Sequence, residues 1–182
     1  MTLFGETPTN TESPLPYQNF QSASDSNWQL AKDLFSDKEN PKLLNPSSMF
    51  KRNNVCFDAL LVGKKSIVLL EIKRRLATFE EIEQRWNGEI FLEKSKWNAM
   101  NKMLIKLKKN HPDKTLKLHY MNKSSDGMLM IWDITNKPEK WTRKLMNNKT
   151  YHKDGVGGDK VWKEVAMLKV TDATLKKTNI FN

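Results

Sequence analysis

Two apolar segments separated by a very short polar stretch constrain the fold of this chain more than any other feature of its sequence. Residues 55–62 and 66–73 are rich in Val, Leu and Ile, and the three residues between them read Gly-Lys-Lys. Apolar runs joined by so short a connection predict the two antiparallel strands of a β-hairpin. Residues 67–70 are apolar in succession, whereas a strand with one face in water alternates. The sequence therefore predicts a hairpin inside a sheet that is covered on both faces.

Three charged residues interrupt this apolar hairpin. Asp58 lies in the first segment, and Glu71 and Lys73 lie at the end of the second. A turn at residues 64–65 places Asp58 directly opposite Glu71, and a turn at residues 63–64 makes them diagonal neighbours. Glu71 and Lys73 share one face because side chains alternate along a strand. Either turn therefore gathers the three groups on one face, whereas a register shifted by one residue would separate Asp58 from the others.

Two carboxylates held this close in an apolar setting require compensating positive charge, because burial and mutual repulsion both disfavour their ionised forms. Lys73 supplies one charge, and a divalent cation would supply the rest. Oxygen ligands select Mg²⁺ or Mn²⁺ over softer metals, and the backbone carbonyl of Ile72 can add a further oxygen. Such a cation can activate water and stabilise the charge on a phosphate under attack, with Lys73 placed to orient that water or help to deprotonate it.

The arrangement of these residues resembles the motif of the PD-(D/E)XK nuclease superfamily. Asp58 is followed by twelve intervening residues and then by Glu71, Ile72 and Lys73 at the end of an apolar strand. The spacing is similar to that in archaeal-type Holliday-junction resolvases and several restriction enzymes. The resemblance implies an α/β fold with a restriction-endonuclease-like core, in which a mixed central β-sheet is flanked by helices. It also implies a metal-dependent phosphodiesterase, with Asp58 and Glu71 as metal ligands and Lys73 as the catalytic lysine.

The chain also departs from the superfamily pattern. Phe57 replaces the proline that precedes the aspartate. Members often carry an additional acid on the first helix, for which Asp33 and Glu39 are the candidates. The Gln-x-x-x-Tyr motif of the lambda-exonuclease branch is absent, because Gln84 is followed at that spacing by Gly88. Its absence favours an endonuclease over an exonuclease.

The charge of the chain predicts a polyanionic partner. The formal net charge is +10, and residues 1–25 contain three acids but no Lys or Arg, so residues 26–182 carry a net charge of +13. Such a field attracts nucleic acids and anionic membranes alike. Nucleic acid, with DNA as the expected substrate, is the partner that the motif implies.

Two pairs of basic residues flank the predicted site. Lys51 and Arg52 precede the first strand, and Arg74 and Arg75 follow the second. These side chains can bind phosphates on either side of the scissile bond. A solvated run of charge is an equally good interpretation of both pairs. Lysines along the long helix expected after the hairpin, Lys96 among them, are better explained as its solvated face.

The remaining composition predicts a soluble cytoplasmic protein with no membrane partner. The single cysteine, Cys56, cannot form an internal disulfide, which suits a reducing compartment. The N-terminus lacks the basic start and apolar run of a signal peptide, and no apolar stretch approaches 18 residues. Residues 1–25 are rich in Ser, Thr, Asn and Pro and are expected to form a disordered tail. Residues 26–182 are then expected to form a single nuclease domain.

Patterns of apolar and capping residues predict the other elements. Ser26 is expected to cap a short first helix, and Thr78 is expected to open a second helix with a capping box. A longer helix is predicted over residues 92–109. Strands are predicted over residues 116–121, 128–134 and 161–170.

Together these features predict a Mg²⁺-dependent DNA endonuclease. One alternative is a basic nucleic-acid-binding protein that never cuts, and another is cleavage of RNA by the same site. A homodimer would suit cleavage of both strands or of a junction, but no stretch of the sequence identifies an interface.

Overall fold

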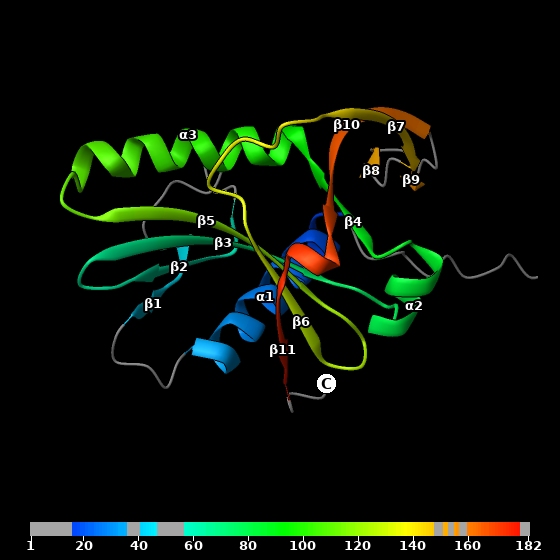
Figure 1. Cartoon of the computed structure of the whole chain (residues 1–182), viewed down its shortest axis with the longest axis horizontal. Coiled ribbons are helices and arrows are strands. Elements are labelled where there is room, and N and C mark those ends of the chain that lie inside the picture. Colours follow the sequence, from blue (N-terminus) through cyan, green and yellow to red (C-terminus); the bar gives the residue numbers. More distant parts are fainter. Residues whose placement is uncertain are drawn as a thin grey trace, which may run out of the picture.

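The structure is a computed structural model that describes residues 16–35, 41–46, 57–147, 151–152, 155–156 and 160–178. Its centre is a six-stranded sheet, whose strands in chain order are β1 (Lys42–Leu44), β2 (Ala59–Val62), β3 (Ser66–Arg74), β5 (Thr115–Lys123), β6 (Met128–Asp133) and β11 (Thr174–Lys177). In space the order is β1-β2-β3-β5-β6-β11 (Figure 1). The strands β3 and β5 are parallel, and the other neighbours are antiparallel. The expected mixed α/β architecture with a mixed central sheet is therefore confirmed.

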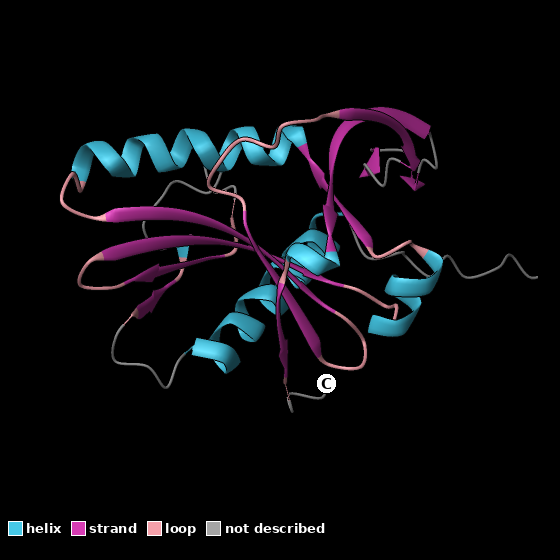
Figure 2. Cartoon of the chain, in the orientation of Figure 1, coloured by secondary structure: helices cyan, strands magenta, loops and turns pink. Residues whose placement is uncertain are grey.

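Two smaller sheets accompany the central one (Figure 2). A three-stranded sheet consists of β4 (Glu89–Glu93), β7 (Thr142–Asn147) and β10 (Lys160–Lys169), with β10 in the middle. The pair β8 (Tyr151–His152) and β9 (Gly155–Val156) forms a two-stranded sheet. A single 3₁₀ turn, Val170–Asp172, follows β10 and leads into β11. The three-stranded sheet was not predicted, although its central strand was.

Helices cover both faces of the central sheet. On one face, α1 (Pro16–Phe35) packs Leu30 and Ala31 against Leu70 and Ile72. On the other face, α3 (Lys94–Asn110) contributes a buried stripe that packs over Leu69 of β3 and its neighbours, namely Trp97, Met100, Met103 and Leu107. A short helix, α2 (Phe79–Arg85), follows β3 and buries Ile82. Since α3 lies between β3 and β5, it forms the crossover that makes these two strands parallel.

The register of the hairpin is the one expected for a turn at residues 64–65. Ala59 pairs with Leu70, and Val62 pairs with Ile67. The backbone N–H of Gly63 donates to the carbonyl of Ser66 over 2.8 Å, which closes the turn. Ile67 and Leu70 are each 1% exposed although they lie on opposite faces. The prediction of a strand buried on both sides is confirmed.

Local signals in the sequence located other elements well. Thr78 Oγ1 accepts from the N–H of Glu81, and the Glu81 side chain accepts from the N–H of Thr78, so the predicted capping box is present. The long helix runs over residues 94–110 instead of 92–109, because β4 includes residues 92 and 93. The predicted strands near residues 116, 128 and 161 are β5, β6 and β10.

The first helix begins at Pro16, ten residues before the predicted start at Ser26. The predicted start at Ser26 was therefore wrong. The disordered tail over residues 1–25 stays a prediction, and residues 1–15 lie outside the described residues. Proline suits the first position of a helix, because its φ is already helical and its missing N–H would have no partner there. None of the described helices is long and apolar enough to cross a membrane.

Candidate active site

Asp58 lies where β2 leaves the central sheet. The paired residues of the hairpin end at Ala59, and the N–H of Asp58 donates instead to the carbonyl of Leu70 over 2.8 Å. The side chain of Asp58 then reaches toward the end of β3, where Oδ2 accepts from the N–H of Ile72 over 2.7 Å. Burial, together with the neighbouring charge of Glu71, raises the pKa of this carboxyl to about 6. The hydrogen bond from Ile72 and the charges of Lys73 and Lys96 lower this pKa and offset only part of that rise.

Glu71 is a buried carboxylate at the end of β3, with 1% of its side chain exposed. Its Oε1 lies 2.7 Å from Lys73 Nζ and 3.0 Å from Lys96 Nζ. Neither carboxylate oxygen accepts a hydrogen bond of good geometry from the described residues. Oε1 is therefore compensated by two ammonium groups, and Oε2 is a buried oxygen with capacity for a further ligand.

Lys73 is the most accessible of these groups, with 41% of its side chain exposed. Its burial disfavours the charged ammonium, but the ionised Glu71 beside it has the larger combined effect and raises the pKa of Lys73 to about 12. The ammonium is thus protonated throughout the physiological range. Lys73 can donate hydrogen bonds to a water or a phosphate oxygen, and it is poorly suited to removing a proton.

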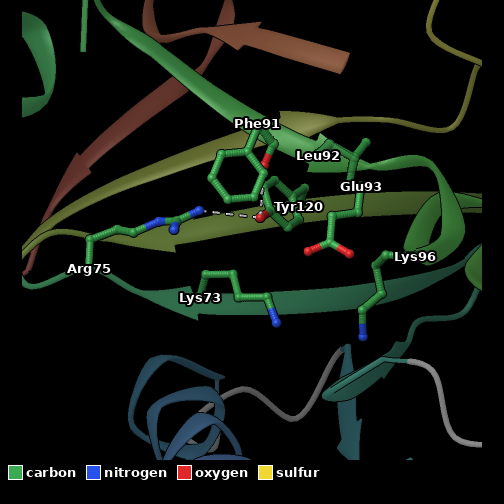
Figure 3. A pocket seen from close by; sticks show the side chains of 7 residues that line it. All are labelled: Lys73, Arg75, Phe91, Leu92, Glu93, Lys96 and Tyr120. Carbon is green, nitrogen blue, oxygen red and sulfur yellow. Dashed lines mark hydrogen bonds between the residues drawn. The ribbon is translucent and has the colours of Figure 1, made fainter. Parts of the chain in front are cut away.

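A pocket of about 180 Å³ opens beside these charges (Figure 3). It is lined by residues of β3, β4, β5 and α3, namely Lys73, Arg75, Phe91, Leu92, Glu93, Lys96 and Tyr120. Figure 3 shows Arg75 toward one end of the pocket and Lys96 toward the other, with Tyr120 between them. This pocket next to the predicted carboxylate site is therefore bordered by basic side chains at both ends.

Arg75 is held in this pocket by several contacts. Its Nε donates to Asn122 Oδ1 over 2.6 Å, and its Nη2 lies 3.4 Å from the Tyr120 hydroxyl. The guanidinium also lies 5.5 Å from the centre of the Phe91 ring, within the range of a cation–π contact. Burial raises the pKa of Tyr120, so its hydroxyl remains neutral at physiological pH. Arg75 therefore presents a fixed positive charge to anything that enters the pocket.

The charges around the pocket leave a positive surplus. Glu93 is already paired with Lys163, whose Nζ lies 3.0 Å from Glu93 Oε1. The remaining groups are three cations, namely Lys73, Lys96 and Arg75, and the two carboxylates of Asp58 and Glu71. A pocket with one surplus positive charge before any metal binds is suited to an anionic ligand such as a phosphate.

The oxygen atoms near the end of β3 fit a hard divalent cation. Asp58 and Glu71 provide carboxylates, and the carbonyl of Ile72 directly follows Glu71 in the chain. The buried Oε2 of Glu71 has no hydrogen-bond donor among the described residues. Among the described residues, no group of three or more His, Cys, Asp or Glu side chains is arranged so that it could hold a metal ion. A donor set of two carboxylates and one carbonyl has the chemistry that Mg²⁺ accepts, since this ion keeps several water ligands and is usually bound through one or two carboxylates.

Asn27 of α1 belongs to this site, although it was not predicted. Its Nδ2 lies 3.0 Å from the carbonyl oxygen of Ile72 and 3.3 Å from Asp58 Oδ1. The same amide therefore contacts two of the oxygens that would bind a cation. A single polar residue on a helix 31 positions before Asp58 gives no local signal, so only the tertiary structure identifies it.

Lys96 was assigned to the solvated face of the long helix, and this assignment was wrong. Lys96 lies in the first turn of α3, where the chain returns from β4 over the end of β3, and it contacts Glu71. The predicted residues Asp58, Glu71, Ile72 and Lys73 do lie together, and Arg75 lines the adjoining pocket.

The structure places the other candidates elsewhere or does not describe them. Arg74 is exposed at the end of β3. Asp33 is exposed and accepts a hydrogen bond from Gln29 Nε2 over 2.7 Å. It lies six residues after Asn27 in α1, which is about 9 Å along the helix axis. Glu39, Lys51 and Arg52 lie outside the described residues, as does Cys56.

Comparison of the chain with protein-family models, with curated proteins and with solved structures found no match. The arguments for its function therefore come from the residues and geometry described above.

Proposed function

We propose that this protein is a divalent-cation-dependent nuclease of the PD-(D/E)XK type, with a restriction-endonuclease-like core, that hydrolyses phosphodiester bonds in DNA. The observation that carries the proposal is the convergence of Asp58, Glu71 and Lys73 at the end of one buried strand, beside a basic pocket. A partly buried acid whose carboxyl has a pKa of about 6, next to a second buried acid, is costly for stability and is typical of functional sites.

The order of the elements supports the same proposal. A helix, α1, precedes the three antiparallel strands β1, β2 and β3, and a second helix, α3, leads to the parallel strand β5. The superfamily resemblance implies a helix before the motif strands and a helix and strand after them. The motif residues also lie at the end of β3, where a cavity adjoins the sheet.

The roles of the side chains follow from their contacts. A Mg²⁺ ion held by Asp58, Glu71 and the Ile72 carbonyl would activate water and neutralise phosphate charge. Lys73 is protonated and accessible, so it would orient the attacking water or donate to a non-bridging phosphate oxygen. Arg75 lies where it can bind a phosphate that enters the pocket. In the reaction, the water oxygen would bond to phosphorus and the bond from phosphorus to the leaving oxygen would break. The attacking water would release a proton to solvent, and the leaving oxygen would take a proton from solvent to become a hydroxyl.

A cleavage panel tests this proposal. The full chain is incubated with supercoiled plasmid, single-stranded DNA and RNA, each with Mg²⁺ and with EDTA. We expect Mg²⁺-dependent cleavage of DNA, and loss of cleavage in Glu71→Gln and Lys73→Gln. Lys117→Gln is the matched control, because Lys117 also forms an ion pair at 3.0 Å, with Asp133, on the surface of β5.

Three outcomes separate the proposal from its alternatives. Cleavage of RNA alone would assign the site to an RNA-cleaving enzyme. Binding of nucleic acid without cleavage under any condition would favour a non-catalytic binding protein. Normal cleavage by both the Glu71→Gln and Lys73→Gln variants would show that the site is assigned wrongly.

A further inference from the structure

An exposed aromatic patch lies on one face of the three-stranded sheet, away from the pocket described above. Trp162 of β10 and Leu145 of β7 are directly opposed across the ladder, and they are 60% and 47% exposed. The guanidinium of Arg143 lies 5.5 Å from the centre of the Trp162 ring. Lys160 shares this face because it lies two residues before Trp162. We call these four residues the Trp162 patch.

The charge around the Trp162 patch favours an anionic partner. Arg143 and Lys160 are exposed within it, and Lys144 is exposed on the opposite face of β7. Among the described residues, the two acids near the patch each have a lysine partner. Glu164, which lies opposite Arg143 across the ladder, is 2.7 Å from Lys94, and Glu93 is 3.0 Å from Lys163. The described side chains around the patch therefore have a surplus of positive charge, and an exposed indole beside such a surplus is the combination that binds the bases and backbone of a nucleic acid.

The Trp162 patch is connected to the active-site pocket. A shallow hollow of about 600 Å³ lies at the corner between β10 and the first turns of α3, and it is lined by Glu93, Lys94, Ser95, Asn98, Trp162, Lys163 and Glu164. Glu93 lines the pocket as well as this hollow. Figure 1 shows β7 and β10 beyond the end of α3 at which that helix begins. A nucleic-acid strand that left the pocket past Glu93 would reach the hollow that Trp162 lines.

We propose that the Trp162 patch binds a single-stranded segment of the nucleic acid substrate by stacking a base on the Trp162 indole. In a duplex the base faces are already stacked on each other, so an exposed indole can pair only with an unstacked base. A second copy of this chain fits the patch less well. In a symmetric dimer the patch would face itself, and Arg143 and Lys160 would meet like charges.

This inference rests on the proposed function, because that function identifies the partner as nucleic acid. The test therefore measures binding under conditions in which no cleavage occurs. A fluorescently labelled 20-nucleotide oligo-dT and a duplex of the same length are titrated with the full chain in EDTA, and anisotropy is measured. We expect the wild type to bind the single strand more tightly than the duplex. We expect Trp162→Ala to lose about tenfold in affinity for the single strand, which corresponds to the binding free energy of one stacked base. Trp86→Ala is the matched control, because Trp86 is 42% exposed at the end of α2.

Each outcome decides the inference. Equal affinity of Trp162→Ala and the wild type for the single strand would overturn it, as would a wild type that binds only the duplex. A wild-type dimer that Trp162→Ala converts to a monomer in sedimentation would assign the patch to self-association. Circular dichroism confirms that the variant is folded. A wild type that binds through Trp162 but never cuts would overturn the proposed function and leave this inference standing.

A separate observation concerns Asn27. Its Nδ2 donates to Asp58 Oδ1 and to the Ile72 carbonyl, which are two of the oxygens proposed to bind a cation. An N–H donor and a cation cannot share those oxygens from the same side. We infer that the Asn27 amide competes with a cation for these two oxygens, and that it turns its own oxygen toward the cation when one binds. An asparagine can do both, because its amide carries a donor and an acceptor on one rotatable group.

Manganese affinity tests this second inference, which also rests on the proposed function. Mn²⁺ binding to the full chain is measured by electron paramagnetic resonance, without substrate. We expect Asn27→Ala to weaken binding about tenfold and Asn27→Asp to strengthen it, because a carboxylate is the better ligand for a hard cation. Gln29→Ala, on the exposed side of the same helix, should bind Mn²⁺ as the wild type does.

The outcomes distinguish the two claims. If Asp58→Asn loses Mn²⁺ but Asn27→Ala keeps wild-type affinity, Asn27 only ties α1 to the sheet and the inference fails. In that case the proposed metal site stands. If the wild type binds no Mn²⁺ at millimolar concentration, the inference and the proposed function both fail.

Discussion

Replacing Asp58 by asparagine should stabilise the metal-free protein, although it removes a proposed metal ligand. Burial and the charge of Glu71 raise the pKa of Asp58 from 3.8 to about 6, so the folded state favours the protonated carboxyl. Two pKa units correspond to about 3 kcal/mol, which is the cost of the ionised carboxylate to the folded state above pH 6. An amide is uncharged, as the protonated carboxyl is. Its oxygen can keep the hydrogen bond from the Ile72 N–H, and its NH2 group then requires the Asn27 amide to present its oxygen instead of Nδ2. Asp58→Asn should therefore raise the free energy of unfolding by up to about 3 kcal/mol at pH 8.

The sign of the pH dependence follows from the same shift. Because the folded state binds this proton more tightly than the unfolded state, the stabilising contribution of Asp58 is complete below pH 4. It is lost as the pH rises through about 6. The difference in stability between Asp58→Asn and the wild type should thus grow between pH 4 and pH 7 and then level off. Contributions from titrating groups that do not interact with Asp58 cancel in that difference.

Urea denaturation followed by circular dichroism, in EDTA, measures these quantities. A gain of about 3 kcal/mol in the free energy of unfolding at pH 8 corresponds, in thermal unfolding, to a rise in Tm of about 6–12 °C for a chain of this size. Adding Mg²⁺ should stabilise the wild type and leave Asp58→Asn unchanged. If Asp58→Asn is less stable than the wild type at pH 8 without metal, Asp58 is not a strained carboxylate and the reasoning is refuted.

Three further predictions concern the fold that supports the site, and urea denaturation measures each. Gly127 has φ +85°, and a Cβ there would lie 2.8 Å from the carbonyl oxygen of Thr178. Gly127→Ala should therefore lower the free energy of unfolding by more than about 1 kcal/mol. An unchanged free energy of unfolding would contradict this packing. Thr78→Ala removes half of the capping box of α2 and should cost about 0.5–2 kcal/mol, whereas Thr78→Ser should retain most of it. Leu118→Ala removes a fully buried side chain from beneath α3 and should cost about 2–5 kcal/mol, and a loss below 1 kcal/mol would show that β5 is not packed as described.

The parts of the fold that were predicted correctly depend on residues close together in the chain. The hairpin register follows from a turn of two residues, and the capping box follows from Thr78 and Glu81, three positions apart. The motif residues were located for the same reason, since Asp58 and Glu71 lie on the two strands of one hairpin. Local patterns were sufficient in these places because the interactions that stabilise them are local.

The parts that were missed depend on residues far apart in the chain. β4 is a short apolar segment that pairs with β10, more than 60 residues later, and short apolar segments do not distinguish strand from helix. Lys96 reaches Glu71 only because β4 and α3 bring it back over β3. Asn27 meets the Ile72 carbonyl across 45 positions. These contacts arise from packing of the whole molecule, which one sequence does not reveal.

The most direct test of the proposed site is the position of a bound metal. A crystal soaked in Mn²⁺ allows the ion to be located by its anomalous scattering. We predict one strong peak within about 2.5 Å of carboxylate oxygens of both Asp58 and Glu71. The absence of a peak between these two residues, in a crystal whose pocket is open to solvent, would contradict the assignment of this protein as a metal-dependent nuclease.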